Sequence, residues 1–292
     1  MIACPAMTCM VSGRDDQEAA TTTRPRPSFD IRAATRPLVM GVLNVTPDSF
    51  SDGGQFADPD AAIRQAERMA AEGADILDIG AESTRPGHKP ISAEEELARL
   101  LPILSSIVGL GLPVSVDTMK ASVAETCLSY GVGIINDVWG LQHDPDMAGV
   151  VARHHVPLII MHNRTAADST IDILDDIAAF FTRSLKLAED AGIRRERIIL
   201  DPGIGFGKTV EQSIETLAHL PRLMQFGLPM LIGLSRKRFI ASVSPSEPHE
   251  RLAGSIAANV LAVQAGAAII RVHDVAETVQ ALRVVAAIEQ AR

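Results

Sequence analysis

The chain has 292 residues, 47% of them hydrophobic, which is enough for one large domain or two modest ones. Its formal net charge of −9 argues against a general nucleic-acid binder, because neutralising phosphates requires a positive face, but leaves room for a local basic pocket. No uninterrupted apolar run approaches the ~20 residues of a membrane span. We therefore expect neither a nucleic-acid nor a membrane partner.

Residues 1–36 differ from the rest of the chain. They show no sustained periodicity and end in Pro- and Arg-rich sequence, so we expect a disordered N-terminal extension before a single domain at 37–292. Acidic residues near its start speak against a transit peptide, and a secretory signal pattern is missing. The cysteines Cys4, Cys9 and Cys127 have no paired spacing, which favours a reducing cytoplasm and makes Cys127 a small core residue.

From Leu38 onward, short apolar runs alternate with longer stretches of helical character. Eight strands are predicted at Val39–Leu43, Ile76–Ile79, Val114–Val116, Ile134–Ile135, Leu158–Ile160, Ile198–Leu200, Met230–Gly233 and Ile269–Val272. Helical stretches include Ala61–Glu72, Ala93–Ile107, Ile171–Ala191 and Ala276–Glu289. The units span ~255 residues, close to the ~250 of a barrel. A doubly wound open sheet is the alternative, but eight regular units without a second domain favour an α/β protein with a (β/α)8 TIM barrel.

Polar or charged side chains follow every predicted strand. In parallel α/β folds, the carboxyl ends of the strands carry the active site, so we expect these groups to converge on one mouth. Ordinary roles remain open for single members: Asp117 as a helix cap, Asn136 as a turn residue, His273 as a satisfied core histidine. Those roles together do not account for polar residues at one end of all eight strands.

One group of these side chains suits a flat, nitrogen-rich heterocycle. Asp117 and Asp201 can accept paired N–H donors from such a ring, Asn136 can both donate and accept, and Lys237 adds an ammonium group.

A second group suits an anion. Arg271 presents a forked donor set to phosphate oxygens, with His273 beside it. The amide oxygen of Asn44 can join a hydrated Mg²⁺, which favours few protein ligands. Residues 203–208, reading GIGFGK, resemble a phosphate-cradling loop without Walker A spacing; close backbone approach to a ring is an equally open interpretation.

The motifs that carry these residues resemble those of the dihydropteroate synthase family of pterin-binding enzymes. They occur in family order over everything after residue 37: NVTPDSFSDGG from Asn44, ESTRPG from Glu82, DPG from Asp201 with GFGK from Gly205, SRK from Ser235 and RVHD from Arg271. Ala81 and Ile204 depart from residues frequent in the family, at positions that touch no proposed catalytic group.

The resemblance implies a barrel enzyme, usually dimeric, in folate biosynthesis. It would join 6-hydroxymethyl-7,8-dihydropterin diphosphate to 4-aminobenzoate, releasing diphosphate and 7,8-dihydropteroate by an SN1-like path with Mg²⁺. The roles implied by motif are pterin binding by Asp117, Asn136, Asp201 and Lys237; diphosphate binding by Asn44, Arg271 and His273, with Asn44 at the metal; and aminobenzoate binding by Phe50, Thr84, Arg85, Pro86, Ser235 and Lys237. Asp52, Lys237, Arg271 and His273 would be the catalytic residues, with Asp52 facing the developing positive charge.

Two rival functions remain. A pterin-dependent methyltransferase on the same barrel would need no diphosphate site, so Arg271 and His273 speak against it. A non-catalytic pterin-binding homologue is disfavoured because Asn44, Asp52 and Lys237 are all present.

Overall fold

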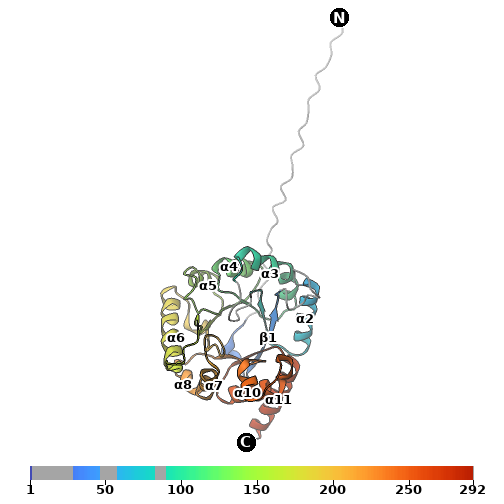
Figure 1. Cartoon of the computed structure of the whole chain (residues 1–292). Coiled ribbons are helices and arrows are strands. Elements are labelled where there is room, and N and C mark those ends of the chain that lie inside the picture. The colour runs from blue at the N-terminus through green and yellow to red at the C-terminus, as the bar shows by residue number, and fades with distance from the viewer. Residues whose placement is uncertain (2–28, 47–57, 83–89, 292) are drawn as a thin grey trace.

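The computed structural model describes residues 1, 29–46, 58–82 and 90–291. Within them, eight parallel strands form one sheet that curls into a ring (Figure 1). The strands are β1 (Leu38–Asn44), β2 (Ile76–Gly80), β3 (Val114–Asp117), β4 (Ile134–Asp137), β5 (Leu158–Met161), β6 (Ile198–Asp201), β7 (Leu231–Gly233) and β8 (Ile269–Val272). All eight predicted strands are present, and four of them, β1, β3, β4 and β6, extend by one or two residues into the polar position that follows the apolar run.

The ring is nearly closed. The strand order is β6-β5-β4-β3-β2-β1-β8-β7, so β1 pairs with both β2 and β8. Between the outer strands β6 and β7, Leu200 and Met230 form a single parallel bridge, and the Leu200 N–H donates to the Pro229 carbonyl at 2.9 Å. The predicted (β/α)8 barrel is therefore confirmed, and the alternative of a doubly wound open sheet is wrong.

Helices surround the strands in chain order, and α11 returns beside α2 (Figure 1). They are α2 (Pro59–Ala71), α3 (Ala93–Val108), α4 (Ala121–Ser129), α5 (Met147–His154), α6 (Ile173–Asp190), α7 (Val210–Ala218), α8 (Leu220–Leu223), α9 (Arg238–Val243), α10 (Leu252–Gln264) and α11 (Val275–Gln290). Polar caps fix several starts: Asp172 accepts from two backbone N–H groups of α6, and Thr209 forms a capping box with Gln212 at α7. Among the described residues, no helix is long and apolar enough to cross a membrane.

Inside the barrel, the layer of side chains nearest the amino ends of the strands, called the lowest layer below, is apolar. It consists of Met40, Ile76, Ile134, Ile159, Ile199, Leu231 and Ile269, all fully buried. The alternate strand positions point outward and pack against the helices in the larger core, where Cys127 is buried as expected. The two-residue period of a strand thus separates a small inner core from a large outer one.

The segment before β1 closes the bottom of the barrel. Residues 29–36 fall within the predicted extension, yet Ile31–Ala33 forms a 3-10 turn, and Ile31 is buried against the lowest layer beside Phe29. The physical reason is that Ile31 covers apolar strand ends that would otherwise face water. This part of the chain therefore belongs to the barrel; the rest of the predicted extension, residues 2–28, lies outside the described residues.

Candidate active site

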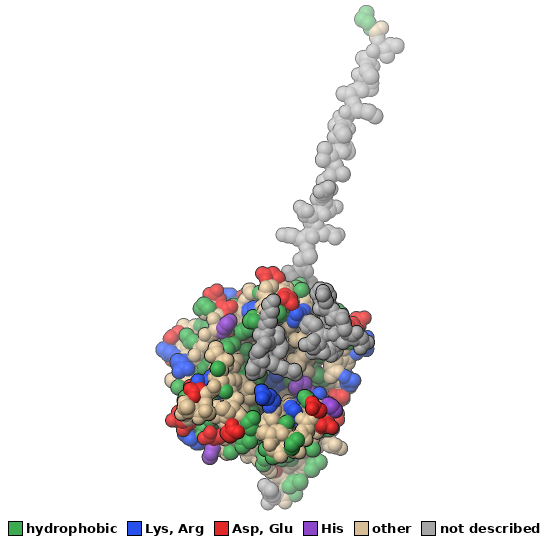
Figure 2. Space-filling view, in the orientation of Figure 1, with side chains coloured by type: hydrophobic (Ala, Val, Ile, Leu, Met, Phe, Trp, Pro, Cys, Tyr) green, Lys and Arg blue, Asp and Glu red, His purple; other side chains and the backbone are tan. Residues whose placement is uncertain are grey.

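The next inward layer of the barrel is polar. Two residues beyond the apolar layer, the same face of the strands carries Asp78, Asn136, Asp201 and Arg271. Asp78, Asn136 and Asp201 are at most 5% exposed. Viewed along the barrel axis, basic side chains gather beside a hollow at the centre of the ring of helices (Figure 2).

Arg271 ties two carboxylates together at the floor of this hollow. Its Nε donates to Oδ2 of Asp78 at 2.6 Å, and its Nη2 donates to Oδ2 of Asp117 at 3.0 Å. The Asn136 amide nitrogen also donates to Asp78, at 3.3 Å. Two of the three Arg271 nitrogens are thereby engaged by acidic groups, which leaves Nη1 to reach a ligand.

Two buried acceptors on this floor have no partner. Oδ1 of Asp78 and Oδ1 of Asn136 make no hydrogen bond in the described structure. A buried, unpaired polar atom is costly unless a ligand or water satisfies it, so the two oxygens indicate a site for N–H donors. Asp78 was not among the predicted site residues.

Burial makes Asp117 difficult to ionise. The pKa of Asp117 is raised to about 8, chiefly because burial desolvates the carboxyl group; the Arg271 guanidinium opposes this rise, and the Asp78 charge adds to it. Donors from a bound ligand would favour the ionised form. Proton release should therefore accompany the binding of such a ligand near neutral pH.

Asp201 and Lys237 face each other across the loop after β6. The Gly203 N–H donates to Oδ1 of Asp201 at 2.7 Å, and Lys237 donates to the Ile204 carbonyl. The Lys237 ammonium also lies 4.5 Å from the ring centroid of Phe206. Burial raises the pKa of Asp201 and lowers that of Lys237 to about 8, while each charge favours the ionised form of the other.

Ser235 and His273 form a second pair at the mouth. The Ser235 hydroxyl accepts from the His273 backbone N–H at 3.2 Å and lies 3.1 Å from Nδ1 of its ring. Next to them, Arg236 holds a left-handed backbone with φ of 60° and is bound to Asp274, the residue before α11. This ion pair joins the ends of β7 and β8, so Ser235, Lys237 and His273 are held at neighbouring strand ends.

Asn44 is the last residue of β1, at the rim of the barrel. Its side chain makes no hydrogen bond with another described residue, so its amide oxygen is available to a ligand. Among the described residues, no group of three or more His, Cys, Asp or Glu side chains could hold a metal. A single amide oxygen suits a hydrated Mg²⁺ that takes its other ligands from water and phosphate, and would not suit a cage of protein ligands.

The structure thus brings together Asp117, Asn136, Asp201, Ser235, Lys237, Arg271 and His273 around one hollow, with Asn44 at its rim. The other predicted site residues lie outside the described residues: Phe50, Asp52, Thr84, Arg85 and Pro86. Their roles stay predictions.

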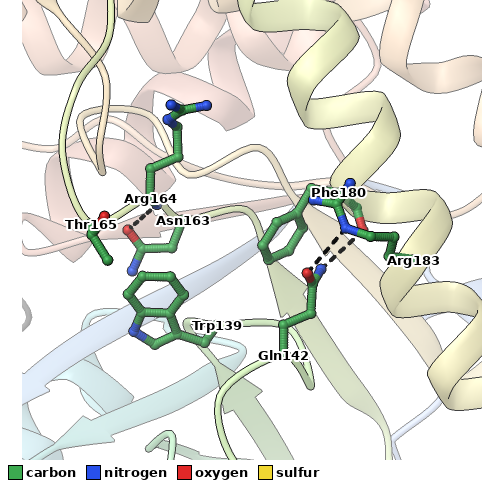
Figure 3. A pocket seen from close by; sticks show the side chains of 7 residues that line it. All are labelled: Trp139, Gln142, Asn163, Arg164, Thr165, Phe180 and Arg183. Atoms are coloured by element: carbon green, nitrogen blue, oxygen red, sulfur yellow. Dashed lines mark hydrogen bonds between the residues drawn. The ribbon is translucent and has the colours of Figure 1, made fainter.

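A separate pocket of about 320 Å³ is lined by the residues drawn in Figure 3. Its walls come from the segments after β4 and β5 and from α6, and its lining residues are Trp139, Gln142, Asn163, Arg164, Thr165, Phe180 and Arg183. None of the predicted site residues lines it. The convergence of charged groups at the barrel axis is the stronger indication of where chemistry occurs.

Comparison with known proteins agrees with this site. Residues 40–273 match the model of the pterin binding enzyme family. A curated relative, dihydropteroate synthase of Bacillus subtilis strain 168, is 48% identical over 239 residues, covering 82% of this chain and 84% of the relative.

Solved structures agree as well. Dihydropteroate synthase of Xanthomonas albilineans with 4-aminobenzoic acid superposes with a TM-score of 0.84 at 47% identity, covering 87% of this chain and 94% of that one. The same enzyme in complex with 7,8-dihydropteroate gives a TM-score of 0.80 at 45% identity, with the same coverage. The fold and the site define a pterin-binding barrel enzyme. Within that class, the chain belongs to the dihydropteroate synthase family, transferases of folate biosynthesis.

Proposed function

We propose that the chain joins 6-hydroxymethyl-7,8-dihydropterin diphosphate to 4-aminobenzoate at the hollow above Asp78, with the pterin ring on the barrel floor. The observation that carries this placement is the pair of buried, unpartnered oxygens on Asp78 and Asn136. Together with Asp117, they offer acceptors to the amino and ring N–H groups of a pterin. Asp201 and Lys237 would hold the other edge of the ring. The Xanthomonas albilineans enzyme, solved with 4-aminobenzoic acid and with dihydropteroate, supports the choice of substrates.

The diphosphate would lie nearer the rim, where Nη1 of Arg271, the His273 ring and the Asn44 amide can reach it. These groups offset the charge that develops on the leaving diphosphate. Mg²⁺ held by Asn44 would supply further positive charge to the diphosphate oxygens. Departure of the diphosphate leaves a cation delocalised over the electron-rich pterin, which the aromatic amine can attack without an enzyme nucleophile. The buried Cys127, whose pKa burial raises to about 12, is not a candidate nucleophile.

The aminobenzoate subsite is proposed from the motifs alone for Phe50, Thr84, Arg85 and Pro86, and so is the role of Asp52 beside the developing cation. Ser235 and Lys237 would complete this subsite. Both are already fixed at the β7 end by their contacts with His273 and Ile204.

We also propose a homodimer, as the resemblance implies, in the cytoplasm. Exposed apolar side chains on α10 and α11, among them Leu261, Val284 and Ile288, are 55–59% exposed and would be covered by a second copy. Cysteines without paired spacing fit a reducing compartment.

The assay for this function measures diphosphate and dihydropteroate formed by purified protein with dihydropterin diphosphate, aminobenzoate and Mg²⁺. We expect equal amounts of both products and loss of turnover on chelation of the metal. Transfer of a methyl group from a folate donor, without diphosphate release, would identify a methyltransferase instead. Pterin binding without turnover in the full mixture would identify a non-catalytic homologue.

A further inference from the structure

The side chain of Lys208, the last residue of the loop after β6 (residues 203–208), donates hydrogen bonds to the backbone of that same loop. Lys208 is 8% exposed, and its Nζ donates to the Gly203 carbonyl at 2.9 Å and to the Phe206 carbonyl at 3.2 Å. The third contact of Nζ is Nδ1 of His162 at 2.6 Å. An ammonium group has three N–H donors, and these three acceptors use all of them. The Lys208 ammonium therefore has no donor left for a phosphate.

His162 is itself held in place from α6. The ring is fully buried, its Nε2 lies 3.0 Å from Oδ2 of Asp176, and Nη1 of Arg164 donates to the same oxygen at 2.8 Å. Burial and the nearby Lys208 charge lower the pKa of His162 to about 3, so the ring is neutral. Its partners then assign the proton to Nε2, facing the carboxylate, and leave Nδ1 to accept from Lys208.

The 203–208 loop packs so closely on residues 162–164 that a shift of the loop would change its contacts with them. Gly203 and Gly207 have φ of 63° and 53°. A Cβ on Gly203 would lie 2.0 Å from the His162 carbonyl oxygen, and one on Gly207 would lie 2.4 Å from Cβ of Arg164. Both positions therefore need glycine, and the loop lies directly on residues 162–164. This close approach to residues 162–164 accounts for Gly203 and Gly207, and no bound phosphate is needed to explain them.

The opposite side of the loop carries active-site contacts. The Gly203 N–H holds Asp201, the Ile204 carbonyl holds Lys237, and the Phe206 ring lies beside the Lys237 ammonium. Lys208 therefore bonds to the loop at the two residues, Gly203 and Phe206, that position Asp201 and Lys237 on the other side.

We propose that Lys208, anchored through His162 and Asp176, is a positioning residue for the synthase reaction. It fixes the conformation of the 203–208 loop, and the loop in turn fixes where Asp201 and Lys237 contact the substrates. This inference rests on the proposed function. Lys208 touches neither substrate in it and acts only through the loop.

The protonation of Lys208 gives the contact a pH dependence. Its pKa is lowered to about 7, chiefly by burial; the charges of Asp201 and Asp176 oppose this, whereas those of Lys237 and Arg164 add to it. The neutral amine has two N–H donors for three acceptors, so one of the contacts with Gly203, Phe206 and His162 is lost as the pH rises through this pKa.

Lys208→Met tests the positioning role, with Lys186→Met as the matched control. Lys186 is 65% exposed on α6 and pairs only with neighbouring surface carboxylates, so its loss should leave kinetics and melting temperature unchanged. For Lys208→Met we expect kcat to fall about a hundred-fold, as for a small misplacement of reacting groups. A folded Lys208→Met protein with wild-type kcat and KM would overturn the proposal, even if its melting temperature had dropped.

Asp176→Asn provides a milder test if Lys208→Met does not fold. Asn can still accept from His162, but one of the two carboxylate charges that raise the pKa of Lys208 is removed, while that of Asp201 remains. We expect the alkaline limb of the kcat profile to move to lower pH, with the acidic plateau unchanged. An unmoved limb would contradict the proposal. Turnover by the wild-type protein in the same assay separates the two claims, because its absence counts against the proposed function itself.

Discussion

Arg271→Met is expected to reduce turnover by ~10²–10³-fold, the range seen when one donor to a developing negative charge is removed. The same change removes the only cation that contacts both Asp78 and Asp117 in the described structure. Two neighbouring carboxyl groups would then share a buried site without a counter-charge. We therefore expect a loss of stability of ~3–5 kcal/mol as well, measured by denaturant unfolding near neutral pH.

Two controls separate these effects. Arg68 on α2 is exposed, so Arg68→Met should change neither turnover nor stability. Arg271→Lys keeps the positive charge but loses the fork that reaches both carboxylates, so it should recover part of the stability and little of the turnover. Near-native turnover in Arg271→Met would show that the guanidinium serves the carboxylates alone and has no part in the reaction.

Lys237→Met should also lower kcat by about a hundred-fold, but with little loss of stability. Lys237 lies where both substrates are proposed to meet, and its ammonium is held by the Ile204 carbonyl and the Phe206 ring. Burial lowers its pKa to about 8, which means that the folded protein bears a cost for keeping the group charged. Methionine has a similar shape and carries no such cost, but the buried Asp201 loses a counter-charge, so the two effects leave only a small net change in stability.

The lowered pKa of Lys237 also predicts how the stability difference between the wild-type protein and Lys237→Met changes with pH. Between about 8 and the ordinary value of 10.5, the folded protein binds fewer protons at Lys237 than the unfolded chain, so this group makes wild-type stability rise with pH. Lys237→Met lacks that rise. The difference in unfolding free energy should therefore favour the variant most at neutral pH and shrink at higher pH; a variant that loses stability most at neutral pH would contradict the burial cost.

The positions of the strands could be predicted from the sequence because short apolar runs alternate with helical stretches, and five of the eight runs are followed directly by a polar residue. Asp117, Asn136 and Asp201 occupy strand ends, and the structure places them around one hollow. Asp78 was missed because it lies inside the apolar run Ile76–Ile79, and a strand covered on both faces does not reveal which positions point inward. The charge of Asp78 within this apolar run was the one feature of the sequence that could have identified it as a site residue.

Contacts between distant segments could not be predicted in the same way. His162 and Lys208 are both recognisable as polar residues after strands, yet their pairing depends on how the glycine loop lies on residues 162–164. The contact of Ile31 with the barrel could not be predicted either, because a single apolar residue in an aperiodic segment does not show that it closes the barrel. The roles of Asp52 and Arg85 rest on motif resemblance and remain predictions.

The placement of the pterin on the barrel floor is tested most directly by calorimetric titration of a pterin into the protein near neutral pH, in two buffers of different ionisation enthalpy. Asp117, with its pKa raised to about 8, is largely protonated in the free enzyme and would ionise to accept the ring N–H groups. We predict one-site binding by the wild-type protein with proton release, and Asp117→Asn binding about ten- to a hundred-fold more weakly without it. A binding enthalpy that is the same in both buffers, together with unchanged affinity in Asp117→Asn, would contradict the placement.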